Sequence, residues 1–148
     1  MNIENILKEL IKFNTVGDKD NNEILRWITN FLCLLGFKVK LLKNKRLNKA
    51  NLFATTGKNP LLTFIGHIDT VSAGENWSRD LFKMSIEKDR IYGLGSSDMK
   101  GGIASFLSAI SQINFKNCER GLNILFTYDE EGEFNGIRNF IKNKKLNT

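Results

Sequence analysis

The sequence predicts an α/β domain in which a mostly parallel or mixed sheet is flanked by helices in three layers. Three observations favour this class. Segments with helical apolar spacing alternate with short strand-like segments, the glycines and the single proline fall at turns, and no internal repeat or low-complexity segment breaks the pattern. Because the pattern stops one helix after a central strand, we expect the domain to be incomplete.

Two helices and three strands are predicted in the first half of the chain. Apolar residues three and four positions apart predict the helices, and alternating or continuous apolar segments predict the strands. Asp20 or Asn21 could cap the second helix, and Gly36 follows its last turn, where glycine is favoured. The run LLTFIGH is typical of a strand covered on both faces. The predicted ranges are a helix over 3–13, a helix from the cap to 35, and strands over 37–42, 51–56 and 61–67.

A loop with a short hairpin opens the second half, and a buried strand lies between its two helices. Lys88, Asp89 and Arg90 are expected to form the turn of the hairpin. The glycine-rich segment GLGSSDMKGG leads into the first of the two helices. The predicted ranges are the loop and hairpin over 77–93, a helix over 99–113, a strand over 122–128 and a helix over 134–143.

The composition is that of an ordinary soluble domain, with 41% hydrophobic and 26% charged residues in 148 positions. No apolar run approaches the roughly 20 residues of a membrane helix, and the mixed-charge N-terminal segment MNIENILKELIKF does not resemble a secretory signal. Cys33 and Cys118 are too few for a disulfide framework, and Cys33 lies in an apolar run that favours a buried thiol. We therefore expect a cytoplasmic protein that does not bind membranes.

The formal net charge of +6 raises the question of a nucleic-acid partner. Much of the excess positive charge lies in residues 38–49 and 142–145. Neither run is interleaved with aromatic residues or carries a known nucleic-acid signature. A solvated basic surface is therefore the favoured interpretation, no nucleic-acid partner is expected, and a basic nucleic-acid-binding module is the weakest alternative.

The only histidine of the chain, His67, ends a predicted strand and stands two positions before Asp69. Side chains two apart leave the same face of a strand. A carboxylate in that place can hold one imidazole nitrogen while the other faces a metal ion. A histidine near a strand end is more often purely structural, so the pair alone leaves both interpretations open.

The acidic run Asp129, Glu130 and Glu131 follows a second buried strand. In open α/β sheets functional groups gather beyond the carboxyl ends of the strands. Adjacent side chains point in different directions, so one glutamate could bind a cation while its neighbour acts as a base. A solvated acidic loop is the commoner meaning of such a run.

The segment GLGSSDMKGG resembles a phosphate-binding loop only at first sight. Asp98 occupies the place of the third glycine in G-x-G-x-x-G, and no lysine followed by serine or threonine completes a P-loop. Because a carboxylate would repel phosphate groups, a nucleotide site is not expected here. The glycines instead indicate a tight backbone that presents Asp98 at the start of a helix.

The order of four segments along the chain is more specific than any of them alone. GHIDTV, WSRDLF, YGLGSSDMKGG and TYDEEG follow one another in the sequence. In this order they resemble the N-terminal part of the zinc aminoacylase family, which includes acetylornithine deacetylase, succinyl-diaminopimelate desuccinylase and glutamate carboxypeptidase. The resemblance extends from about residue 5 to 143 and is dense between 61 and 136.

The resemblance implies a role for five residues. His67 matches a ligand of one metal ion, Asp98 the carboxylate that bridges two ions, and Glu131 a ligand of the other. Glu130 matches the general base, and Asp69 the residue that orients the histidine. The peptide bond that follows Asp98 is expected to be cis.

The implied enzyme is a dinuclear zinc amidohydrolase, with cobalt as a possible substitute, that cleaves the amide bond of an N-acylated amino acid or short peptide. The GLG of residues 93–95 and the segment WSRD of 77–80 are similar to acetylornithine deacetylases. Leu94 stands where many relatives carry arginine, and Ser72 replaces a common proline. Acetylornithine deacetylase-like chemistry is therefore preferred, and succinyl-diaminopimelate desuccinylase or a related metallopeptidase is the alternative.

Residues 1–148 match only the N-terminal part of this zinc-dependent catalytic domain. The lid and dimerisation domain, a further acidic ligand and a second histidine of the family have no counterpart, so a homodimer is expected only for a full-length form. Three ligands leave two zinc ions short of their usual four positions each. We expect weak zinc binding, little hydrolase activity and exposed apolar faces that favour aggregation. A non-catalytic binding domain that keeps the fold is the remaining alternative.

Overall fold

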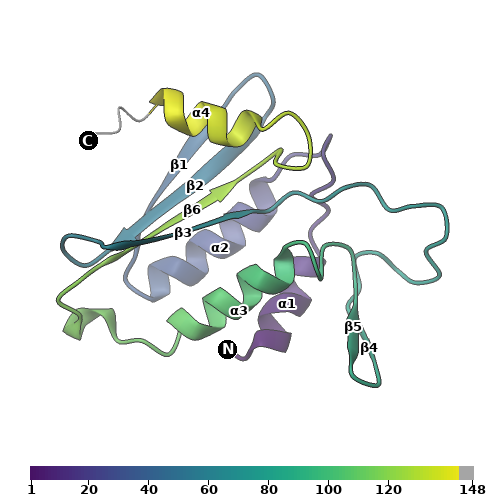
Figure 1. Cartoon of the computed structure of the whole chain (residues 1–148), viewed down its shortest axis with the longest axis horizontal. Coiled ribbons are helices and arrows are strands. Elements are labelled where there is room, and N and C mark those ends of the chain that lie inside the picture. The colour runs from purple at the N-terminus through teal and green to yellow at the C-terminus, as the bar shows by residue number, and fades with distance from the viewer. Residues whose placement is uncertain (144–148) are drawn as a thin grey trace.

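A four-stranded mixed sheet in the order β1-β2-β6-β3 forms the centre of the computed structural model, which describes residues 1–143 (Figure 1). β1 pairs with β2 and β2 with β6 in antiparallel fashion, whereas β3 and β6 are parallel. The mixed α/β sheet predicted from the sequence is therefore confirmed. The strands span Lys38–Asn44 (β1), Lys49–Thr56 (β2), Leu62–His67 (β3) and Leu122–Thr127 (β6).

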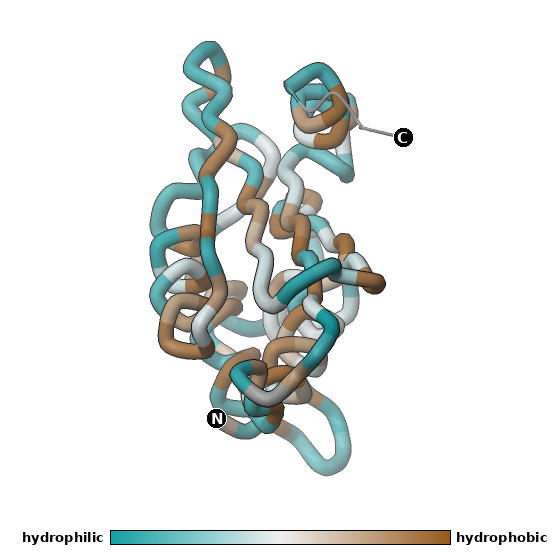
Figure 2. The backbone as a smooth tube through the Cα atoms, turned by 90° about the vertical axis from the view of Figure 1, so that its left-hand side faces the viewer, coloured by the Kyte–Doolittle hydropathy of each residue, from teal (hydrophilic) through white to brown (hydrophobic). Residues whose placement is uncertain are grey.

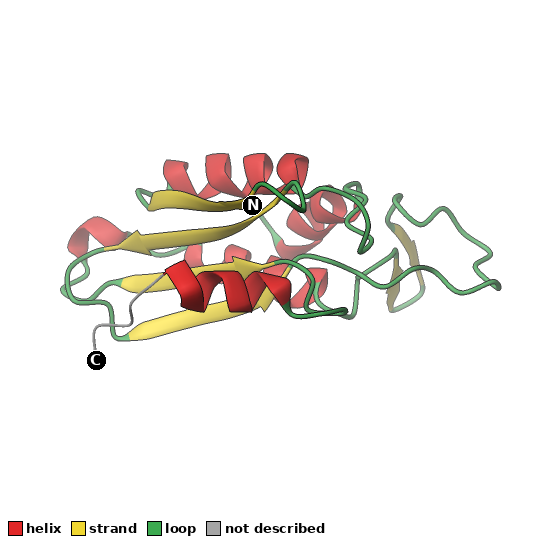
Figure 3. Cartoon of the chain, turned by 90° about the horizontal axis from the view of Figure 1, so that it is seen from above, coloured by secondary structure: helices red, strands yellow, loops and turns green. Residues whose placement is uncertain are grey.

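Helices lie on both faces of this sheet and complete three layers (Figures 1 and 3). The stacked rings of Phe64 in β3 and Phe106 in α3, 3.7 Å apart, join the sheet to the larger helical layer. On the other face Phe140 of α4 packs against Phe53 of β2. Figure 2 shows both hydrophobic and hydrophilic residues along α4, the last helix before the grey C-terminal trace. The helices span Ile3–Ile11 (α1), Asn22–Leu34 (α2), Lys100–Ile110 (α3), Phe115–Asn117 (the 3-10 helix η1) and Asn135–Asn143 (α4).

The core lies between the sheet and the layer formed by α1, α2 and α3. Alternate residues of the central strands point into it, because successive side chains of a strand leave opposite faces. Helical spacing of apolar residues supplies the opposite wall. Its fully buried members include Ile6, Leu10, Ile24, Ile28, Leu32, Leu52, Ala54, Ile103, Leu107, Ile124 and Phe126.

The prediction that residues 61–67 form a strand covered on both faces is wrong in one respect. The strand exists, but β3 is an edge strand that pairs only with β6 in the described part of the chain. The exposed fractions of Leu61, Leu62 and Ile65 are 75%, 64% and 56%. A continuous apolar run in the sequence shows that the side chains are apolar. Whether they are buried depends on neighbouring elements that the run does not specify.

The predicted burial of Cys33 is also wrong, because this cysteine is exposed. The buried stripe of α2 runs through Ile24, Leu25, Ile28 and Leu32. Successive residues of a helix are rotated by about 100° from one another. The position after Leu32 therefore turns away from the core.

The two residues predicted as candidate caps of α2, Asp20 and Asn21, make different hydrogen bonds. Asp20 accepts a hydrogen bond from the backbone N–H of Asn22, 2.9 Å away. Asn21 is the N-cap residue by position, but its side chain pairs with the backbone of Ala50 in β2 instead. Gly36 has a positive φ of 86° beyond the last turn, as predicted.

A two-stranded hairpin of β4 (Ser85–Glu87) and β5 (Arg90–Tyr92) projects from the body of the molecule (Figures 1 and 3). Its predicted position is confirmed, but the turn contains only Lys88 and Asp89, because Arg90 already begins β5. The Arg79 guanidinium lies 4.0 Å from the centroid of the Tyr92 ring and also pairs with Glu87, which ties the preceding loop to the hairpin.

None of the helices within residues 1–143 has the length and apolar character needed to cross a membrane. Part of the predicted basic segment 142–145, and the end of the predicted catalytic segment 1–148, lie outside the described residues.

Candidate metal centre

The carboxyl ends of β3 and β6 lie side by side because these neighbouring strands are parallel, with His67 opposite Thr127. His67 is the last residue of β3. Asp129, Glu130 and Glu131 follow β6 after one intervening tyrosine. The sheet topology therefore brings the two chemically suggestive segments of the sequence to one edge.

The imidazole of His67 is buried and has a close neighbour at each nitrogen. Nδ1 lies 3.1 Å from the backbone carbonyl oxygen of Asp69 and 3.7 Å from its carboxylate Oδ1. Nε2 lies 3.0 Å from Oδ1 of Asp98 and 3.9 Å from Oε2 of Glu130. The Asp69 atom within hydrogen-bond distance of the ring is its carbonyl oxygen, because the strand ends at His67 and the alternation expected from the sequence does not continue. The orienting role of Asp69 stays a prediction.

The Asp69 carboxylate links the segment after β3 to the segment after β6. It is buried, and its Oδ2 accepts a hydrogen bond from the backbone N–H of Glu131, 3.1 Å away. Its Oδ1 is also buried and has no hydrogen-bond partner among the described residues. Asp69 thus fixes the backbone that carries Glu131.

Ligand atoms of His67, Glu130 and Glu131 all lie within 4.8 Å of one another. Desolvation raises the pKa of the Glu131 carboxyl above its ordinary value; the negative charges of Asp98, Glu130 and Asp69 raise it further, while His67 acts in the opposite direction. One imidazole nitrogen and several carboxylate oxygens form a donor set that zinc accepts. The residues therefore fit a metal ion, which would relieve the mutual repulsion of the carboxylates.

The glycine-rich loop before α3 places Asp98 against this cluster. The Asp98–Met99 peptide bond is cis, as the resemblance implied. Gly95 adopts a φ of 78°, and a Cβ atom on Gly101 would lie 2.3 Å from the carbonyl oxygen of Ser96. The close packing of the loop on the first turn of α3 thus depends on glycine at these two positions.

Two residues that follow Asp98 were not singled out from the sequence. The backbone N–H of His67 donates to Sδ of Met99, 3.3 Å away, so Met99 closes the edge of β3 at the histidine. Lys100 is fully buried, and its Nζ donates to the carbonyl oxygen of Phe13, 2.8 Å away. Burial lowers the pKa of Lys100 from 10.5 to about 8. A lysine at the start of a helix gives no local signal of such burial.

Asp129 lies beyond β6 as predicted, but its carboxylate is used for structure. Its Oδ2 lies 2.7 Å from the side-chain Nδ2 of Asn135 and 3.3 Å from the backbone N of the same residue, both of which donate. Asp129 therefore anchors the start of α4, and the carboxylates nearest Nε2 of His67 come from Asp98 and Glu130.

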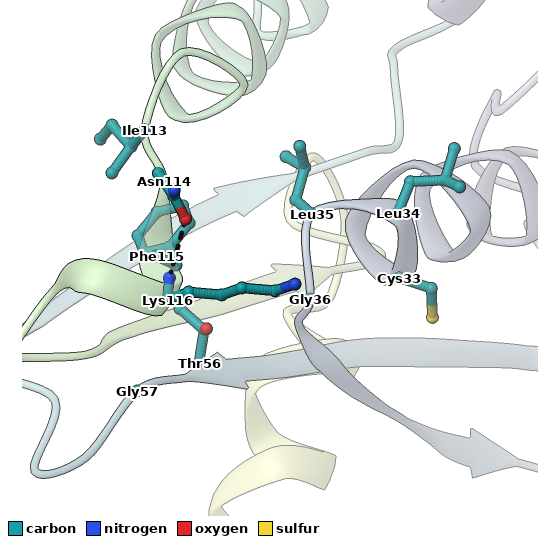
Figure 4. Close-up of a pocket in the computed structure, with 10 residues that line it drawn as sticks. All are labelled: Cys33, Leu34, Leu35, Gly36, Thr56, Gly57, Ile113, Asn114, Phe115 and Lys116. Carbon is teal, nitrogen blue, oxygen red and sulfur yellow. Dashed lines mark hydrogen bonds between the residues drawn. The ribbon is translucent and has the colours of Figure 1, made fainter.

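Two cavities differ in their relation to these residues. One of about 240 Å³ is lined by Asp69, Glu131, residues adjacent to them in the sequence, and Gly17. A larger one of about 550 Å³ lies between the end of α2, the end of β2 and the loop after α3, with the side chain of Lys116 running across it (Figure 4). Its lining contains no histidine or carboxylate. Because carboxylates line the smaller cavity, we take this cavity, and not the larger one, as part of the candidate site.

Residues 63–148, more than half of the chain, match the peptidase family M20/M25/M40. The chain belongs to this family. The metal-binding character of the family agrees with the donor set at the ends of β3 and β6, and the matched segment contains all five residues to which the resemblance assigned roles.

Curated relatives of this chain in the family are named as hydrolases. An acetylornithine deacetylase from Buchnera aphidicola subsp. Schizaphis graminum is 34% identical over 150 residues, covering 95% of this chain and 39% of the relative. A succinyl-diaminopimelate desuccinylase from Ehrlichia chaffeensis is 36% identical over 130 residues, covering 84% of this chain and 34% of the relative. The chain thus spans little more than a third of the length of these relatives.

Two solved structures share the fold of this chain. The M20 family metallo-carboxypeptidase Sso-CP2 from Sulfolobus solfataricus has a TM-score of 0.81 at 26% identity, covering 95% of this chain and 33% of that protein. Human carnosine dipeptidase 1 has a TM-score of 0.80 at 17% identity, covering 95% of this chain and 34% of that protein. The second similarity concerns the fold alone.

Proposed function

We propose that this chain carries the N-terminal part of a zinc-dependent active site that hydrolyses the amide bond of an N-acylated amino acid. The observation that carries this proposal is the convergence of His67, Asp98, Glu130 and Glu131 at the joined ends of β3 and β6. Membership of the M20/M25/M40 family supports the reaction class.

His67, Asp98 and Glu131 are the proposed metal ligands. The buried ring of His67 is held through Nδ1 by the carbonyl of Asp69, which leaves Nε2 facing the carboxylates. Two zinc ions, or cobalt in their place, are the proposed cofactors. A zinc ion bound here supplies Lewis-acid chemistry, since it makes water more acidic and polarises an amide carbonyl.

Glu130 is the proposed general base. Its carboxylate is exposed and lies 3.9 Å from Nε2 of His67, so it borders the donor set while remaining open to solvent and substrate. In this position Glu130 can take a proton from the attacking water and deliver it to the departing amine, which typically accelerates such a step by ~10²–10⁴-fold. Asp69 acts through its neighbours, by holding the His67 ring and the Glu131 backbone.

The proposed substrate is an N-acetylated basic amino acid of the kind that acetylornithine deacetylases are named for. The similarity to that relative and the segments WSRD and GLG support this choice. A succinylated substrate is the alternative, and it is supported by the similar identity to the desuccinylase. Cytoplasmic location and the absence of a nucleic-acid partner stay predictions.

The 148-residue chain alone is proposed to bind zinc weakly and to have little activity. The sequence contains no histidine besides His67. The described carboxylates at the site are shared between two ions in this proposal, so neither ion reaches the four ligands that zinc usually takes.

Calorimetric titration with zinc tests the proposal, with Asp98→Ala as the site variant. Asp89→Ala is the matched control, because it removes a carboxylate from the hairpin turn. Weak binding that is lost in Asp98→Ala and kept in Asp89→Ala supports the site. Binding that is unaffected by Asp98→Ala contradicts it.

Stoichiometry and turnover then separate the remaining possibilities. Two zinc ions per chain, both lost in Asp98→Ala, would mean that the dinuclear centre assembles from these residues. One weak ion would mean that the centre needs further ligands. Efficient hydrolysis of N-acetylornithine by the purified chain would contradict the proposal that these residues are insufficient, and metal binding without any hydrolysis in a longer form would favour a non-catalytic domain.

A further inference from the structure

The side chain of Lys100 runs through the region that holds the glycine-rich loop before α3. Lys100 is 1% exposed, and its Nζ donates to the carbonyl oxygen of Phe13, 2.8 Å away, just beyond α1. Its backbone N–H donates to the carbonyl oxygen of Gly95, also 2.8 Å away, which closes the turn that contains Asp98. One residue therefore joins the loop of Asp98 to the end of α1, the helix beside α3 (Figure 1).

The stem of Lys100 also lies next to the segment after β3. An ideal Cβ atom on Gly95 would lie 2.6 Å from Cγ2 of Thr70 and 3.2 Å from Cδ of Lys100. The loop, the lysine stem and Thr70 therefore meet at a point where only glycine fits without displacing a neighbour. Thr70 directly follows Asp69, whose carbonyl oxygen faces the ring of His67. Packing at this point thus connects the glycine-rich loop with the segment that contacts the histidine.

The segment between α1 and α2, which Lys100 reaches, is itself tied to its surroundings. The N–H of Thr70 donates to the carbonyl oxygen of Thr15, 3.1 Å away, and the two segments form a parallel β-bridge. From the sheet, the buried Lys49 of β2 donates through Nζ to the carbonyl oxygen of Gly17. The hydrogen bond from Lys100 therefore ends on a segment that is fixed to both β2 and the chain after β3.

A charge is an expensive way to fill this space. Burial of an ammonium group costs free energy that a neutral partner only partly offsets. Within residues 1–143 the polar contact of Lys100 Nζ is the neutral carbonyl of Phe13, and no carboxylate pairs with it. An apolar side chain of the same length would fill the space without this cost. A hydrogen bond from a charged donor is strong and directional, however, so the lysine suits the positioning of a loop better than it suits stability.

We propose that Lys100 is a positioning residue for Asp98. By linking the loop to Phe13 and Thr70, it keeps the Asp98 carboxylate opposite Nε2 of His67, 3.0 Å away. The expected effect on zinc rests on the proposed function, because Asp98 is a proposed ligand. The position of the carboxylate can be measured without metal.

Lys100→Met tests the proposal, because methionine keeps an unbranched stem and removes the ammonium with its hydrogen bond. In calorimetric titrations at one fixed pH, the variant should bind zinc more weakly than the unchanged chain by roughly 10-fold or more. Urea denaturation should show that its free energy of unfolding does not fall, since the variant buries no charge.

Ser108→Ala is the matched control. Ser108 is a buried residue of the same helix, and its Oγ donates to the carbonyl oxygen of Met1, 3.3 Å away. The substitution therefore removes a link from α3 to the start of the chain at the end of the helix that is remote from the loop. Zinc affinity should be the same in Ser108→Ala as in the unchanged chain.

A metal-free measurement separates the position of Asp98 from the proposed function. His67 is the only histidine, and the ¹⁵N signal of its Nε2 is sensitive to the Asp98 carboxylate beside it. Asp98→Ala gives the signal of a ring without this carboxylate. Lys100→Met should move the signal most of the way to that value, and Ser108→Ala should leave it in place.

An Nε2 signal that keeps its position in Lys100→Met overturns the proposal, as does an equal change in Ser108→Ala. Weaker zinc binding that accompanies a lower free energy of unfolding would mean that Lys100 only stabilises the fold, and would also overturn it. A shifted signal with unchanged zinc affinity would support the positioning role and contradict Asp98 as a ligand. If the unchanged chain binds no zinc, the proposed function fails, and the Nε2 signal alone decides the role of Lys100.

Discussion

Nε2 of His67 lies 3.0 Å from Oδ1 of Asp98, although the two residues are 31 positions apart in the sequence. The other ring nitrogen faces the carbonyl oxygen of Asp69. A carbonyl oxygen only accepts hydrogen bonds, so Nδ1 must carry a proton wherever this bond is kept. The histidine is thus oriented so that Nε2 is the nitrogen available to a metal ion.

The first prediction concerns this single histidine, whose ring gives one unambiguous set of signals. In long-range ¹H–¹⁵N spectra we expect zinc to shift the Nε2 resonance of His67 and to leave Nδ1 protonated. The shift should be lost or strongly reduced in Asp98→Ala. Binding of zinc through Nδ1 would contradict the orientation described here.

The second prediction is that Asp69→Ala weakens both the fold and the metal site. It removes a buried acceptor from the N–H of Glu131, so the free energy of unfolding should fall by about 1.5–3 kcal/mol. Zinc affinity should fall by roughly 10–100-fold, since Asp69 supports the ring of His67 and the backbone of Glu131, two of the proposed ligands. Urea denaturation and calorimetry measure the two effects.

Asp80→Ala is the control for Asp69→Ala, because Asp80 also accepts from a backbone N–H, that of Phe82 at 2.9 Å, but in an exposed loop. Its effect on stability should be within about 0.5 kcal/mol, and zinc affinity should not change. Equal effects of the two substitutions on stability and zinc affinity would mean that Asp69 supports neither the fold nor the metal site more than an exposed aspartate does.

The third prediction concerns the glycine-rich loop. A Cβ atom on Gly101 would lie 2.3 Å from the carbonyl oxygen of Ser96, so Gly101→Ala must displace the loop that carries Asp98. We expect a loss of about 1–3 kcal/mol in the free energy of unfolding, together with weaker zinc binding. Gly74→Ala is the control, because nothing lies within 4 Å of its Cβ position. Unchanged zinc binding in Gly101→Ala would show that the loop geometry is not needed.

The fourth prediction follows from the buried Lys100, whose pKa burial lowers from 10.5 to about 8. Below pH 8 the lysine is protonated in both states, and its burial destabilises the fold fully. Between pH 8 and pH 10.5 the lysine of the unfolded chain holds a proton that the native chain has released, so the free energy of unfolding rises with pH. The free energy of unfolding should increase by roughly 2 kcal/mol from pH 8 to pH 10.

Lys100→Met isolates this contribution, because the other titrating groups stay the same. Urea denaturation of both proteins across this pH range should show a rise in the unchanged chain that is absent from the variant. Parallel pH profiles would mean that the lysine does not change protonation on folding.

Much of the secondary structure could be predicted from the sequence, and the family resemblance named five candidate site residues whose roles stay predictions. The spacing of apolar residues predicted the helices and strands, because it shows which side chains lie on the same face of a helix or strand. The position of His67, Glu130 and Glu131 after two strands, and of Asp98 in a tight loop, followed from local signals of the same kind. These signals depend only on residues close together in the chain.

The tertiary structure decided which of those faces are covered. The same apolar run fits a central or an edge strand, so only the sheet order shows that β3 is at the edge and exposes Leu62 and Ile65. The burial of Lys100 beside Phe13, and the use of the Asp69 carbonyl by His67, likewise depend on distant segments or on where a strand ends. Local patterns identify the chemical groups that this protein carries. Burial and contact depend on packing between distant elements, whose partners no local pattern specifies.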